Sequence, residues 1–147
     1  MTNWTIRLEP TPSPEIREQI LAPLVRHNEA AAGPGQWRQC AITVRDENDA
    51  IVGGLQARIG YGFMFVELLA LGPAKGQGIG RRVMELAEAE ARAAGLDGIW
   101  LDTWTFQAPG FYEKLGFVEC GRIPDYPPGH SRIFYVKRLT GQHAPSS

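Results

Sequence analysis

The sequence predicts an α/β fold that is built around a mixed sheet. Several short strands in the first half of the chain are followed by a strand–helix–strand unit, which is typical of this class. The strand of that unit, over residues 63–71, is almost entirely apolar, as in a strand that is covered on both faces. The helix after it, over residues 78–94, is amphipathic and is therefore expected to pack one face on a core.

The composition is that of one globular domain. The chain has 147 residues, with 15 Lys and Arg against 16 Asp and Glu, and a domain typically has roughly 100–200 residues. We expect a single domain over residues 1–139 and a flexible tail over residues 140–147. The net charge of −1 provides no basic excess for binding nucleic acid.

The cysteines and the apolar runs bear on metals, disulfides and location. Cys40 and Cys120 are too few and too far apart for a zinc site or a disulfide framework, so we expect both to be buried packing residues. The first residues lack the pattern of a secretory signal. No apolar run approaches the roughly 20 residues of a membrane-spanning helix. We therefore expect a cytoplasmic protein with no metal and no membrane partner.

The first third of the chain predicts a strand, a helix and a hairpin. Residues 5–8 alternate weakly and predict a short strand. Apolar residues at helical spacing predict a helix over residues 15–29, in which Pro23 is expected to cause a kink or a break. Residues 37–45 and 50–60 predict the strands of a hairpin, because a polar turn separates them.

The remainder predicts the apolar strand, the amphipathic helix and three further strands around a short helix. We expect the buried face of the amphipathic helix to contain Ile79, Val83, Leu86, Ala87 and Ala94. The other elements are a strand over residues 98–103, a helix over residues 109–115, and an antiparallel pair over residues 117–122 and 131–138.

The most informative segment enters the amphipathic helix. It reads Lys75-Gly76-Gln77-Gly78-Ile79-Gly80-Arg81-Arg82. Alternate glycines let the backbone approach a ligand closely, and the free N–H groups at a helix start bind anions. Cations in a first turn oppose the helix dipole by a few tenths to about 1 kcal/mol, so a bound pyrophosphate would relieve this conflict. A solvated basic turn without a ligand is the alternative.

Two other phosphate motifs fit this turn poorly. The P-loop string Gly-x-x-x-x-Gly-Lys-Ser/Thr is absent. The dinucleotide fingerprint Gly-x-Gly-x-x-Gly finds its first two glycines in Gly76 and Gly78, but Arg81 stands in place of the third. Asp97 lies at about the spacing of the acidic residue in that fingerprint. A nucleotide-dependent oxidoreductase is therefore a weak alternative.

Two motifs together resemble those of the GNAT superfamily, the acetyl-CoA-dependent N-acetyltransferases. Residues 75–80 are similar to that family's pyrophosphate loop, (Gln/Arg)-x-x-Gly-x-(Gly/Ala). Residues 108–117, Ala-Pro-Gly-Phe-Tyr-Glu-Lys-Leu-Gly-Phe, are similar to its Ala-x-x-Phe-Tyr-x-x-x-Gly-Phe segment, and the motifs occur in the family's order. The resemblance implies a mixed, mainly antiparallel central sheet flanked by helices, with a splayed strand pair that holds acetyl-CoA.

The resemblance also implies the residues that hold acetyl-CoA. It assigns the pyrophosphate to Lys75, Gly76, Gln77, Gly78, Ile79, Gly80 and Arg81, and the pantetheine arm to backbone groups of Leu69, Ala70 and Leu71. Thr105 stands where the family often has an Asn that contacts the CoA arm, and Gln107 is a candidate substitute. Lys75 replaces the usual Gln or Arg. Unlike the guanidinium of Arg, its ammonium group cannot form two parallel hydrogen bonds to one phosphate.

Two residues are candidates for catalysis. Tyr112 matches the tyrosine that protonates the leaving thiolate in many relatives, and a packed aromatic residue is the alternative. A phenol with a pKa near 10 can do this only within hydrogen-bond reach. Glu67 is the one charge in the apolar run, where a carboxylate is unfavourable unless it is solvated or paired. Relatives often use such a glutamate for the amine proton, and an exposed sheet position is the alternative.

The acceptor side is less well defined. The turn-rich loop over residues 125–130 contains an Asp, a Tyr and a His, and it either faces the substrate or is a plain turn. We expect Trp37, Trp100, Trp104 and Phe106 to be mostly core residues. Trp104 and Phe106 are also candidates for lining an acceptor pocket.

The resemblance implies an enzyme that transfers an acetyl group directly from acetyl-CoA to a primary amine of a small molecule or peptide. An acyl-CoA-binding sensor or scaffold with little catalysis is the alternative, because Thr105 and Lys75 depart from the family's pattern. Relatives are often dimers, so the resemblance allows a homodimer. The acceptor's identity does not follow from the sequence.

Overall fold

The structure is a computed structural model that describes residues 2–139. The tail expected over residues 140–147 lies outside the described residues. The chain divides into two units, residues 1–35 and residues 36–147, and each unit is described by itself. The single domain expected over residues 1–139 stays a prediction.

The first unit contains one helix, α1, over Pro14–Ala32. Pro14 suits the first helical position, whose N–H has no acceptor within the helix, and the helix ends at Gly33, where φ is +81°. Pro23 does not divide the helix, because a proline removes one hydrogen bond while the turns on either side continue. The strand predicted over residues 5–8 is wrong: these residues form no strand, since so short a segment needs a partner strand to hold it.

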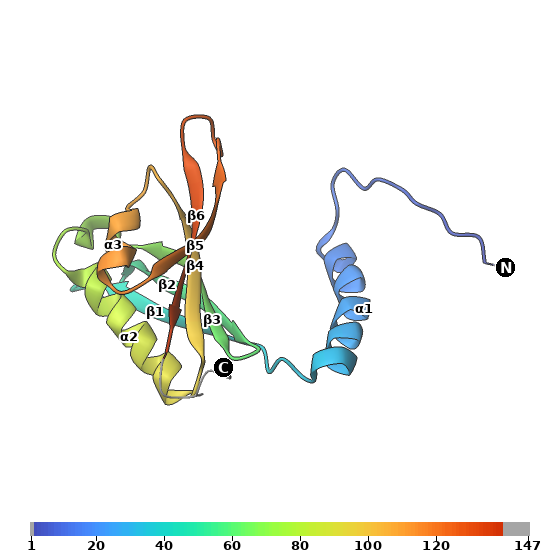
Figure 1. Cartoon of the computed structure of the whole chain (residues 1–147), viewed down its shortest axis with the longest axis horizontal. Helices are drawn as coiled ribbons and strands as arrows, with labels where there is room; N and C mark the ends of the chain where they lie inside the picture. The colour runs from blue at the N-terminus through green and yellow to red at the C-terminus, as the bar shows by residue number, and fades with distance from the viewer. Residues whose placement is uncertain (1, 140–147) are drawn as a thin grey trace. The chain divides into compact units, whose positions relative to one another are not determined.

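The second unit contains a six-stranded sheet (Figure 1). The strands are β1 (Arg38–Arg45), β2 (Ile51–Gly60), β3 (Phe63–Ala70), β4 (Gly98–Trp104), β5 (Val118–Pro124) and β6 (Ser131–Arg138). Their order across the sheet is β1-β2-β3-β4-β6-β5. Only the β3–β4 pair is parallel within residues 36–139. The predicted mixed, mainly antiparallel sheet is therefore confirmed.

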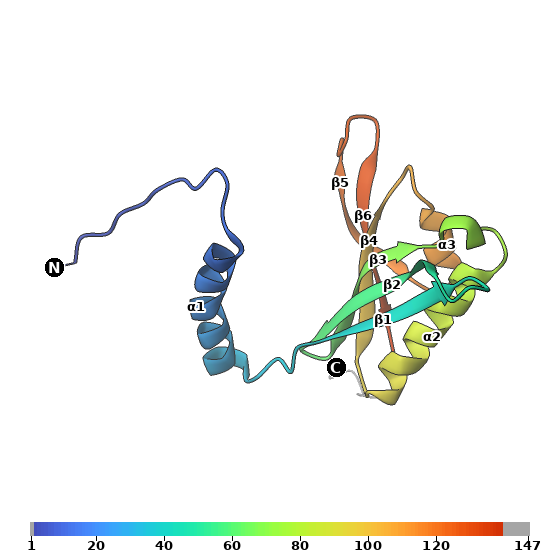
Figure 2. The same ribbon diagram turned by 180° about the vertical axis from the view of Figure 1, so that it is seen from behind.

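Two helices and a short 3-10 turn accompany the sheet within residues 36–139. They are η1 (Gly72–Ala74), α2 (Ile79–Ala93) and α3 (Pro109–Lys114). Both helices lie on the same side of the sheet (Figure 2). The core between them and the sheet includes Met64, Ile99, Leu101 and Tyr135, all fully or almost fully buried. No helix in residues 2–139 is both long enough and apolar enough to cross a membrane.

The buried face of α2 differs from the predicted face. Its buried residues with side chains are Val83, Met84, Ala87 and Ala91. Leu86 was expected on this face but is 57% exposed, because it lies about 100° around the helix from Ala87. Ala94, also expected there, is exposed and follows the last residue of the helix.

Several residues expected in the core are exposed. Cys40 is partly buried against the core, but Cys120 is exposed. Cys120 lies on β5, which is the outermost strand of the sheet and has only exposed residues. Trp37 is 57% exposed and Phe106 is 55% exposed. Trp37 precedes the other edge strand and Phe106 lies in a loop, so neither residue is covered on both sides by neighbouring strands.

The parallel strands β3 and β4 separate halfway along their length. Residues 63–66 of β3 pair with residues 98–101 of β4, and Val66 and Leu101 are the last partners. β4 continues beside β6 as far as Trp104, while β3 continues beside β2 as far as Ala70. We call the opening beyond Val66 and Leu101 the fork. It confirms the predicted splayed strand pair.

A bulge in β3 coincides with the fork. Val66 and Leu68 pair with the consecutive residues Ala57 and Gln56 of β2, so Glu67 is the extra residue between them. A bulge bends its strand and increases the local twist. The bulge at Glu67 therefore accounts for the departure of β3 from β4 at this point.

Candidate functional site

The turn that enters α2 presents backbone N–H groups beside open space. Gly76 and Gly78 have φ values of +86° and +73°, which L side chains rarely adopt. Gly78 is the N-cap of α2, and no side chain caps the helix, so its first N–H groups have no acceptor within the helix. A Cβ atom built on Gly76 or Gly78 would meet no atom within 4 Å. The turn therefore fits a bound anion.

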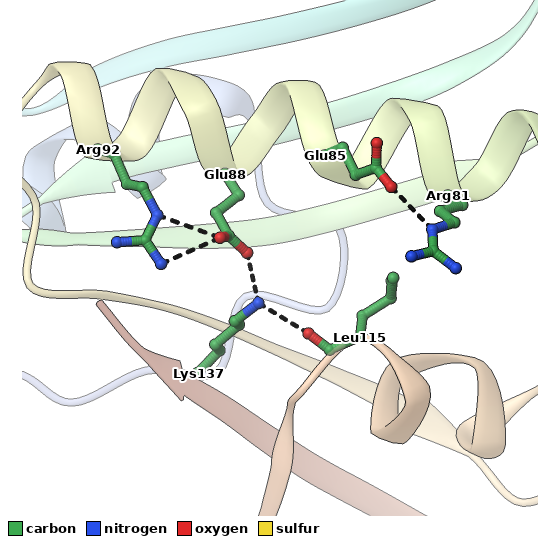
Figure 3. Close-up of polar contacts among 6 residues, drawn as sticks. All are labelled: Arg81, Glu85, Glu88, Arg92, Leu115 and Lys137. Atoms are coloured by element: carbon green, nitrogen blue, oxygen red, sulfur yellow. Dashed lines mark hydrogen bonds and ion pairs between the residues drawn. The ribbon is translucent and has the colours of Figure 1, made fainter. Parts of the chain in front are cut away.

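Positive side chains surround this glycine turn. Lys75, Arg81 and Arg82 are exposed, as is Gln77, and the first turn of α2 has no acidic residue. Arg81 Nε lies 2.8 Å from an oxygen of Glu85 (Figure 3), which offsets one of the charges. Neither Lys75 nor Arg82 has an ion-pair partner among residues 2–139. Positive charge therefore remains where the helix dipole is also positive.

Two predicted binding residues of this turn also pack inside the protein. Ile79 is partly buried against the core. Gly80 is buried, and a Cβ atom built on it would lie 3.0 Å from Leu71 Cδ1 and 3.2 Å from Phe111 Cζ. The absence of a side chain at Gly80 therefore lets the start of α2 pass close to α3.

One edge of β3 has no neighbouring strand beyond the fork. The ladder with β4 ends at Val66, whereas the ladder with β2 reaches Ala70. Leu69 and Ala70, two of the predicted binding residues, lie on this segment, and Leu71 follows it directly before η1. An extended ligand with amide groups can pair with such an edge as an added strand does. The free edge and the glycine turn are consecutive in the chain.

Two acidic residues stand where the fork opens. Glu67 and Asp102 directly follow the last partners, Val66 and Leu101. Glu67 is exposed, so its carboxylate is in contact with solvent. This removes the free-energy cost that a buried, unpaired carboxylate would have in an apolar strand. Asp102 was not predicted as a site residue. The same signal was present, because Asp102 is the one charged residue of β4, as Glu67 is of β3.

Asp102 is held in an ion pair with β6. Arg132 Nε donates a hydrogen bond to Asp102 Oδ1 at 2.9 Å, and a terminal nitrogen of Arg132 lies 2.8 Å from the same oxygen in an ion pair. The side chain of Asp102 is 11% exposed and that of Arg132 is 28% exposed. The two charges therefore compensate each other in a partly buried position on the fork.

Tyr112 is partly buried and packs its ring against the core. The ring lies 5.1 Å from that of Phe111 and 6.0 Å from that of Phe117, edge to face in both cases. The hydroxyl has no hydrogen-bond partner in the described part of the chain. Burial, and secondarily the charge of Asp102, raise the pKa of Tyr112 above its ordinary value. The phenol therefore keeps its proton at neutral pH and can donate it.

Thr105 and Gln107 hold the loop that follows β4. Thr105 Oγ1 accepts a hydrogen bond from the backbone N–H of Ser131 at 3.0 Å. Gln107 Oε1 accepts from Thr103 Oγ1 at 2.6 Å and from the backbone N–H of Trp104 at 3.0 Å. These bonds engage both side chains with the protein itself. A contact of either side chain with CoA stays a prediction.

A partly buried lysine connects α2, the end of α3 and β6 (Figure 3). Lys137 Nζ donates to a carboxylate oxygen of Glu88 at 2.6 Å and to the backbone carbonyl of Leu115 at 2.8 Å. These three residues, here called the lysine clamp, line a groove of about 350 Å³. Because α3 carries Tyr112 and α2 begins at the glycine turn, the clamp sets the position of the phenol relative to that turn.

The charge of Glu88 is favoured in the clamp. Partial burial by itself raises the pKa of Glu88, but hydrogen bonds from Lys137 and Arg92 outweigh this effect and hold the pKa below its ordinary value. Arg92 lies 3.1 Å from the carboxylate. The clamp is therefore formed by an ionised Glu88.

Known sequences match most of this chain. A family model described as "Acetyltransferase (GNAT) family" matches residues 5–117. An acetyltransferase of Agrobacterium fabrum is 34% identical over 126 residues, which are 85% of this chain and 92% of the relative. Blasticidin-S acetyltransferase of Streptomyces morookaense is 41% identical over 95 residues, which are 63% of this chain and 70% of the relative.

Solved structures share the fold. The crystal structure of an acetyltransferase from Agrobacterium tumefaciens has a TM-score of 0.87 and 32% sequence identity, and the match covers 92% of this chain and 100% of that one. A streptothricin acetyltransferase of Bacillus anthracis, crystallised with acetyl coenzyme A, has a TM-score of 0.55 and 22% identity over 62% of this chain and 57% of that one. The second similarity concerns the fold alone.

Proposed function

Since the chain belongs to the acetyltransferase (GNAT) family, we propose that this acetyltransferase moves an acetyl group directly from acetyl-CoA to a primary amine of a small molecule or peptide. The observation that carries the proposal is the continuity of one segment. The free edge of β3 beyond the fork leads through η1 into the glycine turn. An extended ligand with an amide-containing arm and a diphosphate fits this order.

The glycine turn and its cations are the proposed site for the pyrophosphate. The N–H groups at the start of α2 donate to its oxygens, and Lys75 and Arg82 compensate its charge. The pantetheine arm lies along the backbone of Leu69, Ala70 and Leu71. Acetyl-CoA, when bound in this way, supplies an activated acetyl thioester at the fork.

The residues at the fork then handle two protons. The amine nitrogen forms a bond to the acetyl carbon while the bond from that carbon to sulfur breaks, so the nitrogen loses a proton and the sulfur needs one. Glu67, which is exposed and carries a charge, accepts the proton of the amine directly or through water. Tyr112, whose hydroxyl has no hydrogen-bond partner within residues 2–139, donates the proton to the thiolate.

Tyr112 can perform this step only by direct contact with the sulfur. A thiol has a pKa of about 8.5, whereas an ordinary phenol has a pKa of about 10, and burial raises that of Tyr112 further. The transfer to sulfur is therefore uphill by at least about 2 kcal/mol. A hydrogen bond to the sulfur as charge develops there compensates for this difference.

A relative supports a small-molecule acceptor. One of the similar enzymes is an acetyltransferase of blasticidin-S. Direct transfer also agrees with the positions of the cysteines, because Cys40 lies on β1 and Cys120 on β5, and neither strand borders the fork. We therefore propose no acetyl-cysteine intermediate.

The experiment measures CoA release from acetyl-CoA with a panel of primary amines, and identifies the N-acetylated product by mass spectrometry. We expect equal amounts of CoA and product, and the same rate after replacing both cysteines with serine. Tight acetyl-CoA binding without CoA release across the panel would instead favour the sensor or scaffold role.

A further inference from the structure

Aromatic side chains collect where β4 ends and meets the loop between β5 and β6. The rings of Trp104 and Phe106 are stacked, with centroids 5.9 Å apart. The ring of Tyr126 meets Trp104 at 5.8 Å, and the ring of His130 meets Phe106 at 5.2 Å. We call these four residues the ring cluster.

The ring cluster begins at the fork. Trp104 lies two residues after Asp102 on β4, so both side chains are on the same face of the sheet. Phe106 is 55% exposed and Tyr126 is 43% exposed, although both are large aromatic residues. A group of exposed rings beside a catalytic opening is typical of a binding surface.

Hydrogen bonds hold this surface in place before any ligand binds. The backbone N–H of Thr105 donates to the carbonyl of Ser131 at 2.9 Å, and the N–H of Ser131 donates to Thr105 Oγ1 at 3.0 Å. The N–H of Tyr126 donates to the carbonyl of His130 at 3.0 Å. Because the loop is already fixed, binding loses little conformational entropy.

The charges next to the ring cluster are largely compensated. The guanidinium of Arg132 lies 4.8 Å from the ring centroid of Trp104 and 5.7 Å from that of Tyr126. Its charge is offset by Asp102. Besides Glu67 at the fork, the carboxylate near the cluster is that of Asp125, the one acidic residue of the loop over residues 125–130. A polycationic acceptor needs several carboxylates, so these surroundings favour an acceptor with an apolar body.

We propose that the ring cluster binds the carbon skeleton of the acceptor, and that the acceptor is an arylalkylamine, a primary amine on a short chain that carries a planar aromatic ring. The inference rests on the proposed function. Phe106 provides an exposed ring for stacking, which contributes about 0.5–1.5 kcal/mol beyond the burial of apolar area. Tyr126 forms a second wall. The amine then extends along the strand toward Glu67 at the fork.

The test compares two amines of similar size, 2-phenylethylamine and n-hexylamine, with spermidine as a polycation. For the wild-type enzyme we expect kcat/KM with 2-phenylethylamine to exceed that with either other amine by about tenfold, the upper end of the stacking contribution. Phe106→Leu keeps an apolar side chain without the ring. It should remove most of the advantage over n-hexylamine while leaving KM for acetyl-CoA unchanged.

Binding is measured separately by titrating 2-phenylethylamine into the enzyme with CoA present, and Phe106→Leu should raise its Kd. Trp37→Leu is the matched control, because it removes another aromatic residue that is more than half exposed, next to β1. The control should keep the wild-type preference.

The outcomes separate the two proposals. Faster turnover of spermidine than of 2-phenylethylamine, or an equal loss with both monoamines in Phe106→Leu, would overturn the arylalkylamine inference and leave the acetyltransferase proposal standing. Absence of CoA release with every amine would contradict the proposed amine transfer itself, and the inference with it.

Discussion

Glu67 and Asp102 occupy equivalent positions, since each is the first residue of its strand beyond the last partners shared by β3 and β4. Their surroundings differ. Glu67 is exposed on a bulge, whereas Asp102 is mostly buried and is held by a hydrogen bond and an ion pair with Arg132. One carboxylate is therefore available to accept a proton, while the other is engaged in holding β4 and β6 together. Two carboxylates of similar chemistry can thus take different roles because their surroundings differ.

Substitutions at these two positions should have different effects. Glu67→Gln should lower kcat by about 100-fold, at the lower end of the range of general base catalysis, with little change in stability because the side chain is exposed. Asp102→Asn should lower the free energy of unfolding by about 1–3 kcal/mol, since the partly buried guanidinium of Arg132 loses its charged partner. Steady-state kinetics and urea denaturation measure the two quantities. An unchanged kcat in Glu67→Gln would remove Glu67 from the proton-acceptor role.

Tyr112→Phe should lower kcat by about 100-fold without changing the affinity for acetyl-CoA. The phenol supplies a proton, while its ring alone packs against Phe111 and Phe117, and phenylalanine preserves that packing. Because the pKa of Tyr112 is raised, kcat of the wild type should show no loss from this group until above about pH 10. Single-turnover kinetics over a range of pH check the statements about rate, and calorimetric binding checks the affinity for acetyl-CoA. Wild-type turnover in the variant would exclude Tyr112 as the proton donor.

Gly78→Val should raise the Kd for acetyl-CoA by more than about tenfold. The added side chain would enter the space beside the N–H groups at the start of α2, where a Cβ atom now meets nothing. Gly95→Val is the matched control, because Gly95 has a φ of +71° and equally open surroundings at the opposite end of α2. Both variants should lose about 1–2 kcal/mol of stability from the strained backbone. Equal cofactor affinity in the two variants, with both folded, would contradict the proposed pyrophosphate site.

The lysine clamp should make stability depend on pH. The pKa of Glu88 is lower in the folded protein than its ordinary value, so its contribution is present above about pH 4.5 and is lost as the pH falls through the lowered folded value. Glu88→Gln should therefore be less stable than the wild type at pH 7, and the difference should shrink in acid. Urea midpoints from pH 7 to pH 3 measure it. Glu85→Gln serves as the control, because its pair with Arg81 is exposed and should contribute little.

The family resemblance predicted the splayed strand pair at the fork. Local sequence patterns predicted neither the bulge at Glu67 nor the role of Asp102. The apolar run over residues 63–71 indicated a strand covered on both faces, and β3 fits this only as far as Val66. The bulge at Glu67 depends on pairing with β2, which is a long-range property. Asp102 carried a sequence signal equal to that of Glu67, yet its partner Arg132 is far away in the chain. Its role could be recognised only after β4 and β6 were paired.

Burial was the least predictable property. Cys120 and Trp37 have residue types that are usually buried, but each lies in or next to an edge strand, and strand order is not visible in the sequence. Leu86 shows the same limit on α2, because the pattern identified an amphipathic helix but misplaced the centre of its buried face. Apart from the strand predicted over residues 5–8, element types therefore followed from local periodicity, whereas exposure depended on topology.

The outer strand β5 has a further consequence for behaviour at high concentration. Cys120 is an extra residue that interrupts its register with β6, and Pro124 ends the strand without an N–H group. Glu119 and Arg122 form an ion pair on the same strand. A bulged, charged strand that ends in proline is a poor template for a strand from another molecule. This side of the sheet is therefore protected against edge-to-edge aggregation.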